Sequence, residues 1–425
     1  MDTSKVTVFG AGYVGLVTGI CLATAGHHVT MCDVDEFKID SLRAGNVPFH
    51  EPKLQGLLDE AVGRGAVSFV DPSAVDEFGE FVFVAVGTPS AAGGAVDLRF
   101  VRGVVKDLVT NAPPGTIVVM KSTVPPGTGQ SLCDRLAQKG ISYVSNPEFL
   151  REGRAVDDWL HADRIVLGGD ARAVDRVAAL YADLDAPILR ADIGSVELIK
   201  YASNAFLATK ISFANEIANL CDSVDADISL VMKGVGLDKR IGASFLKAGI
   251  GYGGSCFPKD TRALDFVSSI NGHDFQLLKA VIDVNARQRL APIRALRARC
   301  GDLSGLQIAV LGLTFKPDTD DTREAPAIEI IEMLLGEGAE VLAYDPVGRF
   351  ELDSDMYRQV SSVEEATRGA SAVILATEWE SIVGAEWSGL VAGMLPPRFV
   401  YDGRNALDAS AIKAAGAEYV GVGCR

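Results

Sequence analysis

Residues 5–15 read KVTVFGAGYVG, a run of apolar and β-branched residues that leads directly into a Gly-x-Gly-x-x-Gly motif. Its glycines, Gly10, Gly12 and Gly15, permit a tight turn and let backbone N–H groups approach a pyrophosphate at the start of a helix. A second strand runs into Asp33 about 20 residues later, where a carboxylate can accept hydrogen bonds from an adenosine ribose. This spacing predicts a dinucleotide-binding fold. Because Asp33 would repel a 2′-phosphate, the motif favours NAD over NADP.

The alternation of strand and helix continues outward from this motif and recurs near the C-terminal end. From residue 5 to about residue 195 the apolar runs are KVTVFG, HHVTMCDVD, AVSFVD, FVFVAVGTP, TIVVMKSTVPPG, SYVSNPEF and RIVLGG. After residue 305 they are LQIAVLG, EVLAYDP, SAVILATEW and PRFVYDG. Continuous apolar runs are typical of strands buried on both faces, so we expect two parallel sheets covered by helices.

The middle of the chain has the period of helices instead. Apolar residues recur at helical spacing over 196–215, and a helical connector over 275–290 is expected to kink near Pro292. The predicted fold class is therefore α/β, and three domains are expected. They are a Rossmann NAD-binding domain (1–195), a central all-helical domain (196–300) and a C-terminal Rossmann-like domain (301–425).

Composition excludes several classes of partner. The chain has 425 residues, is 48% hydrophobic and has a formal net charge of −16, which disfavours nucleic acid and anionic lipid surfaces. No run approaches the roughly 18 apolar residues of a membrane span, and the first residues lead straight into a strand, so we expect a cytoplasmic protein. The seven cysteines are never spaced as CxxC, and the five histidines form no cluster with them. We expect reduced thiols and no metal.

Polar residues follow three further strands of the first domain. Thr88 and Thr123 each come just after an apolar run, where a side chain either contacts the cofactor or caps the next helix. Glu148 and Glu152 follow the next run, four residues apart. Glu148 is a candidate general base, with a solvated loop acid as the alternative.

Two polar side chains share one face of the expected central helix. Lys200 and Asn204 are four residues apart, so an ammonium and an amide point the same way. Such a pair can stabilise a developing oxyanion, because both donors are in place where negative charge forms. The alternative is a pair that faces solvent.

A glycine-rich segment, GYGGSCFPKD at 251–260, carries the candidate nucleophile. Pro258 suits the first turn of a helix, which places Cys256 at the positive end of that helix and favours its thiolate. Asp260 follows one turn later, near enough to orient water or the thiol. A simple alcohol dehydrogenase needs no nucleophile, whereas oxidation of an aldehyde to an acid can proceed through a thiohemiacetal. Cys256 therefore indicates an acid product.

The last domain lacks a second Gly-x-Gly-x-x-Gly motif but has cations at expected strand ends. Lys316 and Arg323 lie in FKPDTDDTRE, and Arg404 lies in DGRN. They can hold the phosphates of a nucleotide, or they can be surface charges paired with the acids at 318–321.

Eight motifs together resemble one known family. GAGYVG, VGTPS, KSTVPPGT, NPEFLREG, ELIKYASNAFLATKISFANEI, RIGASFLKAGIGYGGSCFPKD, FKPDTDDTRE and DGRN occur in the order seen in the UDP-glucose/GDP-mannose dehydrogenase family, and they are most similar to its members that act on UDP-glucose. The resemblance covers essentially the whole chain. It implies that UDP-glucose is oxidised to UDP-glucuronate with two NAD, and that the C-terminal domain binds the UDP-sugar.

The resemblance also implies a role for each matching residue. Cys256 would form the thiohemiacetal and thioester, Lys200 and Asn204 would hold the oxyanion, Asp260 and Thr123 would organise water, and Glu148 would act in thioester hydrolysis. The implied cofactor contacts are Gly10, Gly12, Tyr13, Val14, Gly15, Asp33, Lys38, Thr88, Thr123, Glu152, Lys259 and Arg323. The implied substrate contacts are Glu148, Phe149, Leu150, Arg151, Glu152, Lys200, Asn204, Arg240, Phe245, Leu246, Lys247, Ala248, Gly249, Gly253, Lys316 and Arg404.

Other readings of the sequence stay open. Arg240 matches a position that reaches the neighbouring subunit in the family, which implies a homodimer through the helical domain. A sibling enzyme that acts on GDP-mannose is the nearest alternative, although residues 240–249 favour UDP-glucose. A hydroxyacid-type dehydrogenase would share the lysine but would have no use for Cys256. An epimerase would need Tyr-x-x-x-Lys, which is absent from the sequence, and a non-catalytic nucleotide-binding protein would not need the thiol.

Overall fold

The computed structural model describes residues 3–75 and 77–424, and the chain divides into two compact units. The first unit comprises the residues up to Ser203 together with Phe266–Gly272, and the second comprises Asn204–Asp265 and the residues from His273 onward. Among the described residues, no helix is both long enough and apolar enough to cross a lipid bilayer.

The first unit is built on an eight-stranded sheet, counted over the described residues, in the order β3-β2-β1-β4-β5-β6-β7-β8. Its strands are β1 Lys5–Phe9, β2 His28–Cys32, β3 Val67–Val70, β4 Phe81–Val84, β5 Ile117–Met120, β6 Ser142–Ser145, β7 Ile165–Gly169 and β8 Ile188–Ala191. The first six follow the 3-2-1-4-5-6 order of dinucleotide-binding folds. The expectation of an all-parallel sheet is wrong at one place, because β6 and β7 pair antiparallel. The short connection through α6 returns the chain to the edge where β6 ends.

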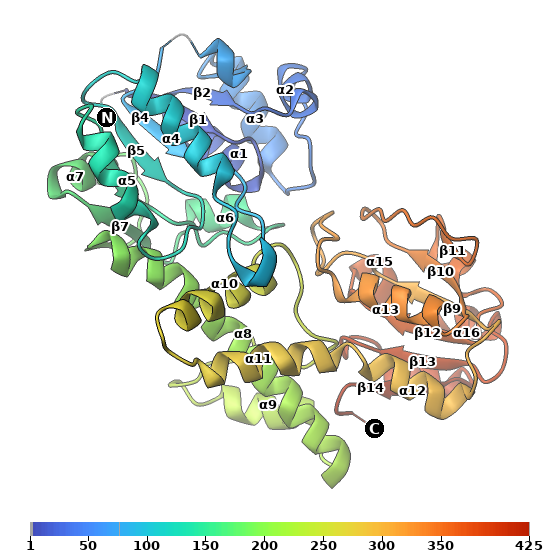
Figure 1. Ribbon diagram of the computed structural model, residues 1–425. Helices are drawn as coiled ribbons and strands as arrows, with labels where there is room; N and C mark the ends of the chain where they lie inside the picture. Colours follow the sequence, from blue (N-terminus) through green and yellow to red (C-terminus); the bar gives the residue numbers. More distant parts are fainter. Residues whose placement is uncertain (1–2, 76, 425) are drawn as a thin grey trace. The chain divides into compact units, whose positions relative to one another are not determined.

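Alternating side chains bury both faces of this sheet. In β4, Phe81 and Phe83 join one apolar cluster, while Val82 and Val84 join another on the opposite face. Figure 1 shows the covering helices. They are α1 Tyr13–Thr24, α2 Glu36–Arg43, α3 Leu54–Gly63, α6 Ala155–Leu160 and α7 Ala171–Ala179 with the first cluster, and α4 Arg99–Asn111 and α5 Thr128–Ala137 with the second. Two short 3-10 turns occupy Pro72–Ala74 and Ala92–Gly94.

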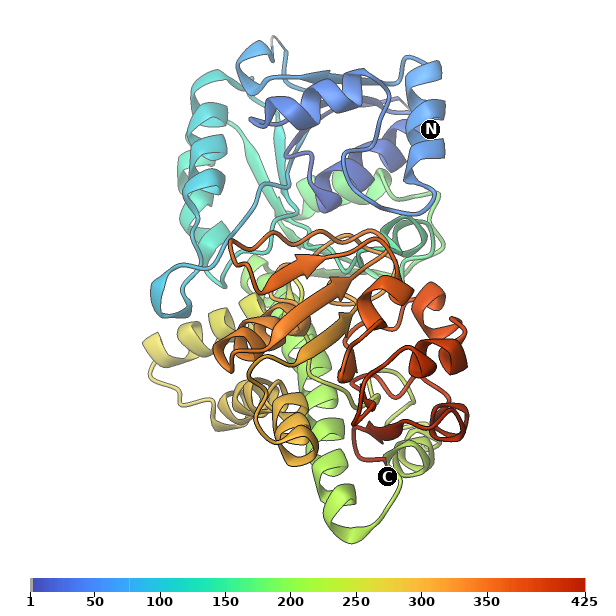
Figure 2. The same cartoon turned by 90° about the vertical axis from the view of Figure 1, so that its right-hand side faces the viewer.

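The middle of the chain is helical, as predicted. Its helices are α8 Ile193–Val224, α9 Ile228–Gly236, α10 Phe257–Ile270, α11 Gln276–Gln288 and α12 Ala291–Cys300. The helix α8, light green in Figure 2, is longer at both ends than the predicted 196–215. It ends at Val224, and the next residue, Asp225, has a left-handed φ of 58°. The connector does not kink at Pro292. It breaks into two helices, and Pro292 lies in the first turn of α12, where its missing N–H is tolerated.

The second unit contains a six-stranded sheet within the described residues, in the order β11-β10-β9-β12-β13-β14 with every pair parallel. Its strands are β9 Gln307–Leu311, β10 Glu340–Tyr344, β11 Tyr357–Gln359, β12 Ala372–Leu375, β13 Phe399–Asp402 and β14 Glu418–Gly421. Helices α12 and α13 Pro326–Gly336 pack on one face, and α14 Val363–Thr367, α15 Glu380–Val383, α16 Trp387–Ala392 and α17 Ala409–Ala414 on the other. The predicted fold class, two Rossmann-type sheets and a helical middle, is confirmed.

Candidate active site

The glycine turn after β1 leaves an open space at the start of α1. A Cβ on Gly10, whose φ is 101°, would lie 2.4 Å from the Ala85 carbonyl oxygen, and a Cβ on Gly15 would lie 1.8 Å from the Gly10 oxygen. These two glycines are therefore required by the packing of the chain itself. Gly12 differs, because a Cβ there would meet nothing within 4 Å. The space at Gly12 fits the close approach of a dinucleotide's pyrophosphate.

Asp33 holds this turn in place and remains half-buried. Its Oδ2 accepts a hydrogen bond from the Ala11 N–H at 2.7 Å, and its Oδ1 accepts one from the Asp35 N–H at 2.9 Å. The nearby Lys38 forms an ion pair with Asp35 at 3.4 Å. Tyr13, at the start of α1, packs its ring on Phe49 with a centroid separation of 4.0 Å. The acid and the glycine turn thus form one edge that can bind an adenosine ribose.

The other predicted cofactor residues of this unit follow neighbouring strands. Thr88 comes after β4 and is buried, and Thr123 comes after β5 and is half-buried. Val14 lies in the first turn of α1, and Glu152 lies in the loop after β6. Because carboxyl ends of parallel strands meet at one edge, these residues follow the same edge as the glycine turn.

A buried ion pair joins the loop after β6 to the helix α8. The Lys200 ammonium donates to Glu148 Oε1 at 2.8 Å, and both side chains are about 5% exposed. The other carboxylate oxygen, Oε2, accepts from the Leu150 N–H at 2.6 Å. The Phe149 ring lies under Lys200 at 5.4 Å from its centroid. The alternatives of a solvated acid and a solvent-facing lysine are therefore wrong.

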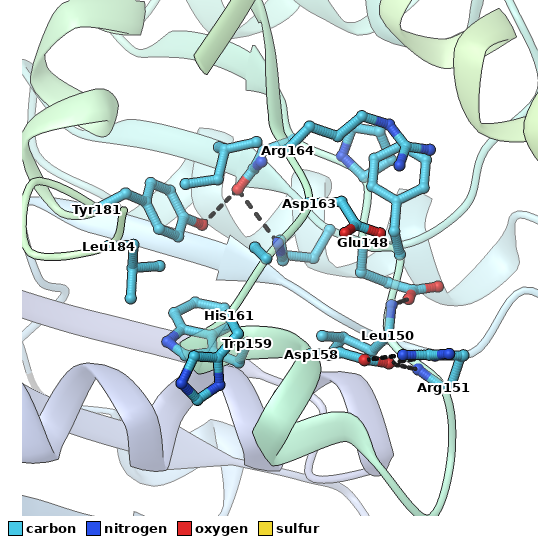
Figure 3. Close-up of a pocket in the computed structure, with 16 residues that line it drawn as sticks. Glu148, Leu150, Arg151, Asp158, Trp159, His161, Asp163, Arg164, Tyr181 and Leu184 are labelled. Atoms are coloured by element: carbon cyan, nitrogen blue, oxygen red, sulfur yellow. Dashed lines mark hydrogen bonds and ion pairs between the residues drawn. The ribbon is translucent and has the colours of Figure 1, made fainter. Parts of the chain in front are cut away.

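A second buried lysine, not expected from the sequence, lies in this region. Lys121 directly follows β5, and its ammonium donates to Asn146 Oδ1 at 3.3 Å and lies over the Trp159 and Tyr181 rings. It lines a pocket of about 100 Å³ that Glu148 also lines; Figure 3 shows the pocket with its hydrogen bonds dashed. Burial lowers the pKa of Lys121 to about 8. The one signal in the sequence is a lysine placed immediately after a fully apolar strand.

A buried carboxylate, also unexpected, ties the loop after β5 to α8. Glu197 accepts hydrogen bonds from the N–H groups of Gly127 and Gly129, both at 2.7 Å, at the start of α5. Burial raises the pKa of Glu197 to about 7, although these two bonds favour the ionised form. This link fixes the loop that begins at Thr123.

In the second unit, the glycine-rich segment places Cys256 at the start of α10, as predicted. The helix begins at Phe257, and the Cys256 carbonyl accepts the helix's first hydrogen bond from the Asp260 N–H at 2.8 Å. The glycines pack closely, since a Cβ on Gly253 would lie 2.3 Å from the Glu324 carbonyl oxygen. The half-buried Cys256 therefore occupies the end of α10 where N–H groups favour a thiolate.

Asp260 forms a buried cluster with two other predicted residues. Its Oδ2 accepts from Asn204 Nδ2 at 2.6 Å, and its Oδ1 accepts from the Lys259 ammonium at 2.5 Å. Asp260 is 1% exposed and Asn204 is 5% exposed. The second unit thus brings together Asn204, Lys259 and Asp260 beside the backbone of Cys256.

The three cations predicted to bind phosphate differ in their surroundings. Arg404 is half-buried and donates to the carbonyl oxygens of Ala376, Gly251 and Phe315, and removal of its guanidinium from water lowers the pKa of that group. It therefore joins the loop that precedes Cys256 to the loop after β9. Arg323 donates two hydrogen bonds to Asp321, one of the acids at 318–321.

The remaining predicted substrate residues divide between surface and core. The Lys316 ammonium lies 5.5 Å from the centroid of the Phe315 ring. Arg240 is exposed and bound to Asp238, and Arg151 is exposed and bound to Asp158. In 245–249, Leu246 and Ala248 belong to the apolar core of the second unit, Lys247 is exposed and Phe245 is half-buried.

Comparison with known proteins gives matches over the whole chain. Three family models of UDP-glucose/GDP-mannose dehydrogenases match it, the NAD binding domain at residues 4–185, the central domain at 194–287 and the UDP binding domain at 309–409. A UDP-glucose 6-dehydrogenase of Bacillus subtilis is 44% identical, with 99% of this chain and 97% of the relative covered. One of Rhizobium meliloti is 42% identical, with 99% of both chains covered.

Solved structures show the same fold. A UDP-glucose dehydrogenase from Pyrobaculum islandicum has a TM-score of 0.91 at 37% identity, covering 100% of this chain and 98% of that one. A UDP-D-ManNAc dehydrogenase from Pyrococcus horikoshii has a TM-score of 0.88 at 26% identity, covering 99% of both chains.

Proposed function

The chain belongs to the UDP-glucose/GDP-mannose dehydrogenase family and is an NAD-dependent oxidoreductase, and we propose that it oxidises UDP-glucose at C6 to UDP-glucuronate. The observation that carries this proposal is the position of Cys256 at the start of α10 with Asp260 in the next turn. Full-length relatives at 42–44% identity that are named UDP-glucose 6-dehydrogenases support the choice of substrate.

The residues of the first unit fit NAD. The turn at Gly10, Gly12 and Gly15 exposes the start of α1, and Asp33 lies beside it at the end of β2. We assign further contacts with NAD to Tyr13, Val14, Lys38, Thr88, Thr123 and Glu152 of this unit, and to Lys259 and Arg323 of the second unit. When bound, NAD accepts a hydride in each of the two oxidations.

The chain's own residues then act on the aldehyde carbon at C6. The Cys256 thiolate adds to the aldehyde formed from the C6 alcohol, and the new C–S bond leaves negative charge on the oxygen. The Lys200 ammonium and the Asn204 amide donate hydrogen bonds to that oxygen. Loss of a second hydride from this adduct gives a thioester. Water, oriented by Asp260 and Thr123, cleaves the C–S bond, and the carboxylate is released with the thiol restored.

Glu148 is assigned to the hydrolysis. Its carboxylate is held by Lys200 and by the Leu150 N–H, which supports a role in taking a proton from water. We propose that the nucleotide and sugar are bound by 148–152, by 245–249 and Gly253, by Lys316 and Arg404, and by Arg240 of a second copy. The corresponding domains are 1–195, 196–300 and 301–425.

A homodimer is part of the proposal. Phe206, Phe213 and Leu220 on α8 are exposed by 66%, 51% and 54%, and their seven-residue spacing places them in one apolar stripe. A second copy of the chain, with the same stripe, would cover it. Phe213→Asp is expected to shift the molecular mass measured by analytical ultracentrifugation from dimer to monomer. A wild-type monomer would contradict this part. A cytoplasmic location stays a prediction.

The test of the chemistry is the NADH stoichiometry of Cys256→Ser. Wild type is expected to form two NADH per UDP-glucose, whereas the variant lacks the thiol and so cannot form a thioester. Cys300→Ser, at the end of α12, is the control and should keep the wild-type ratio. Full turnover of Cys256→Ser would contradict the covalent route. Faster NADH formation with GDP-mannose than with UDP-glucose would contradict the substrate.

A further inference from the structure

We propose that Lys121 is a positioning residue for Glu148, a buried cation that holds this carboxylate in place for thioester hydrolysis. This inference rests on the function proposed above, because it concerns one step of that reaction. Lys121 itself has no part in the two oxidations, so its removal should affect one stage of turnover and leave the other intact.

The burial of Lys121 is the first observation. Its side chain is 5% exposed, and Trp159 and Tyr181 lie under the ammonium at 5.4 and 5.8 Å from their ring centroids. A methionine would fill the same volume without the cost of removing a charge from water. A charge retained in such a place is typical of a functional region.

The contacts of Lys121 lead directly to the loop that carries Glu148. Asn146 Oδ1 accepts from the Lys121 ammonium at 3.3 Å and from the Tyr181 hydroxyl at 2.5 Å, and Asn146 Nδ2 donates to the Val166 carbonyl at 3.1 Å. In Figure 3, Tyr181 lies on one side of these contacts and Glu148 on the other. Asn146 is the first residue after β6, two residues before Glu148. Lys121 therefore fixes the origin of the Glu148 loop.

The charges around Lys121 make its effect depend on pH. Burial lowers the pKa of the ammonium to about 8, the Glu148 carboxylate opposes this shift, and the Lys200 ammonium adds to it. The Tyr181 hydroxyl also faces the ammonium, and burial raises its pKa, so it stays neutral. Asp158, His161, Asp163 and Arg164 also line the pocket. Below about pH 8 the Lys121 ammonium adds a positive charge near the carboxylate that Lys200 binds, and above that pH this added charge is lost.

The experiment compares Lys121→Met with wild type from pH 6.5 to 9.5, with Lys139→Met, an exposed lysine after α5, as the control. Rapid mixing with NAD and UDP-glucose should give Lys121→Met a burst of two NADH per active site, because Cys256 chemistry is intact. Steady-state turnover at pH 7 should fall about 10- to 100-fold, since a misplaced Glu148 slows hydrolysis. The ratio of wild-type to variant turnover should decrease above pH 8, because loss of the charge weakens the hydrogen bond to Asn146. Lys139→Met should match wild type.

Three results would overturn the inference: an unchanged turnover in Lys121→Met, a ratio that does not vary with pH, or loss of the burst together with turnover. A wild-type enzyme that forms no NADH from UDP-glucose would instead refute the proposed function. If Lys121→Met does not give the wild-type far-UV circular dichroism spectrum, the same measurements are made on Tyr181→Phe instead. It removes one hydrogen bond to Asn146 and keeps the ring, so it should slow turnover about threefold with the burst intact. Unchanged turnover in Tyr181→Phe would then overturn the inference.

Discussion

The two sheets of this protein share a strand order but differ in the turn that leaves the first strand. Each has an aspartate directly after the second strand of its order, Asp33 after β2 and Asp345 after β10. In both, the carboxylate accepts at 2.7 Å from the backbone N–H two residues beyond the first strand, that of Ala11 or Leu313. The same local hydrogen bond therefore holds both turns.

The difference lies in the next residue of each turn. Gly12 leaves open space in the first sheet, whereas Thr314 fills the matching position in the second and donates its hydroxyl to Asp345 at 3.2 Å. The Trp379 indole also donates to Asp345, at 3.0 Å, so that this acid is 2% exposed and accepts from six donors. Strand order supplies an edge for ligands, and the first turn decides whether a pyrophosphate can lie directly against the backbone of that turn.

The largest expected effect is a difference in stability between the two acids. Asp345→Asn leaves several buried donors facing an amide, so it should lower the free energy of unfolding by about 3–5 kcal/mol. Asp33→Asn, at a half-buried site with two donors, should cost about 1 kcal/mol and mainly weaken NAD binding. Urea unfolding followed by tryptophan fluorescence measures both. Equal losses of unfolding free energy in the two variants would contradict the difference described between the two turns.

The next effect is a pH dependence in the first sheet. Burial raises the pKa of Glu197 from 4.5 to about 7. Between these values the folded chain keeps a proton that the unfolded chain has lost, so the contribution of Glu197 to stability is full below pH 4.5 and is lost as pH rises to 7. Relative to Glu197→Gln, which does not titrate, wild type should lose about 2–3 kcal/mol from pH 5 to 8.

Urea unfolding at several pH values measures this difference. Glu216→Gln, an exposed carboxylate on the same helix, is the control and should follow wild type. A constant difference between wild type and Glu197→Gln would show that the buried carboxylate does not titrate in this range.

The third effect separates ligand binding from folding. Gly12 has φ −80° and ψ −174°, which alanine also adopts, and a Cβ there meets no atom of the protein. Gly12→Ala should therefore unfold like wild type but raise the KM for NAD about tenfold, which is about 1.4 kcal/mol. Thr314→Ala should do the opposite, with about 1–2 kcal/mol less stability and an unchanged KM for NAD. An unchanged KM in Gly12→Ala would place the pyrophosphate elsewhere.

The smallest effect concerns the indole that covers the second acid. Trp379→Phe keeps a buried ring but removes the N–H that lies 3.0 Å from Asp345 and 3.1 Å from Thr314. Stability should fall by about 1 kcal/mol in urea unfolding. A loss as large as that of Asp345→Asn would mean that packing of the indole, more than the hydrogen bonds of the acid, closes this turn.

The range of each interaction determines how well the sequence predicts it. The glycine turn, Asp33 and the start of α10 behind Cys256 are local patterns, and the structure has them as predicted. The strands β8, β11 and β14 are not predictable in this way, because they are short, partly exposed and lie at or near sheet edges, without a continuous apolar run. The antiparallel direction of β7 depends on the path of the connection from β6, which the hydrophobic periodicity of the sequence does not indicate.

Lys121 and Glu197 are not expected from the sequence for one common reason. Lysine and glutamate are read as exposed unless a partner is known, and the partners of Lys121 and Glu197 lie 25 and about 70 residues away in the chain. Lys200 and Asn204 can be identified because their spacing alone places them together. The roles of Lys200 and Asn204 in catalysis stay predictions.

The unbroken course of α8 limits how this region of the gene can evolve. Along a helix, each residue inserted or deleted turns everything beyond it by about 100° and moves it by 1.5 Å. One codon gained or lost between Lys200 and Asn204 would take the ammonium and the amide off their shared face of the helix, whereas a loop can absorb the same change. Insertions and deletions among descendants of this gene should therefore occur in the loops and not in this helix. Residues of α8 can then be aligned without gaps between related sequences.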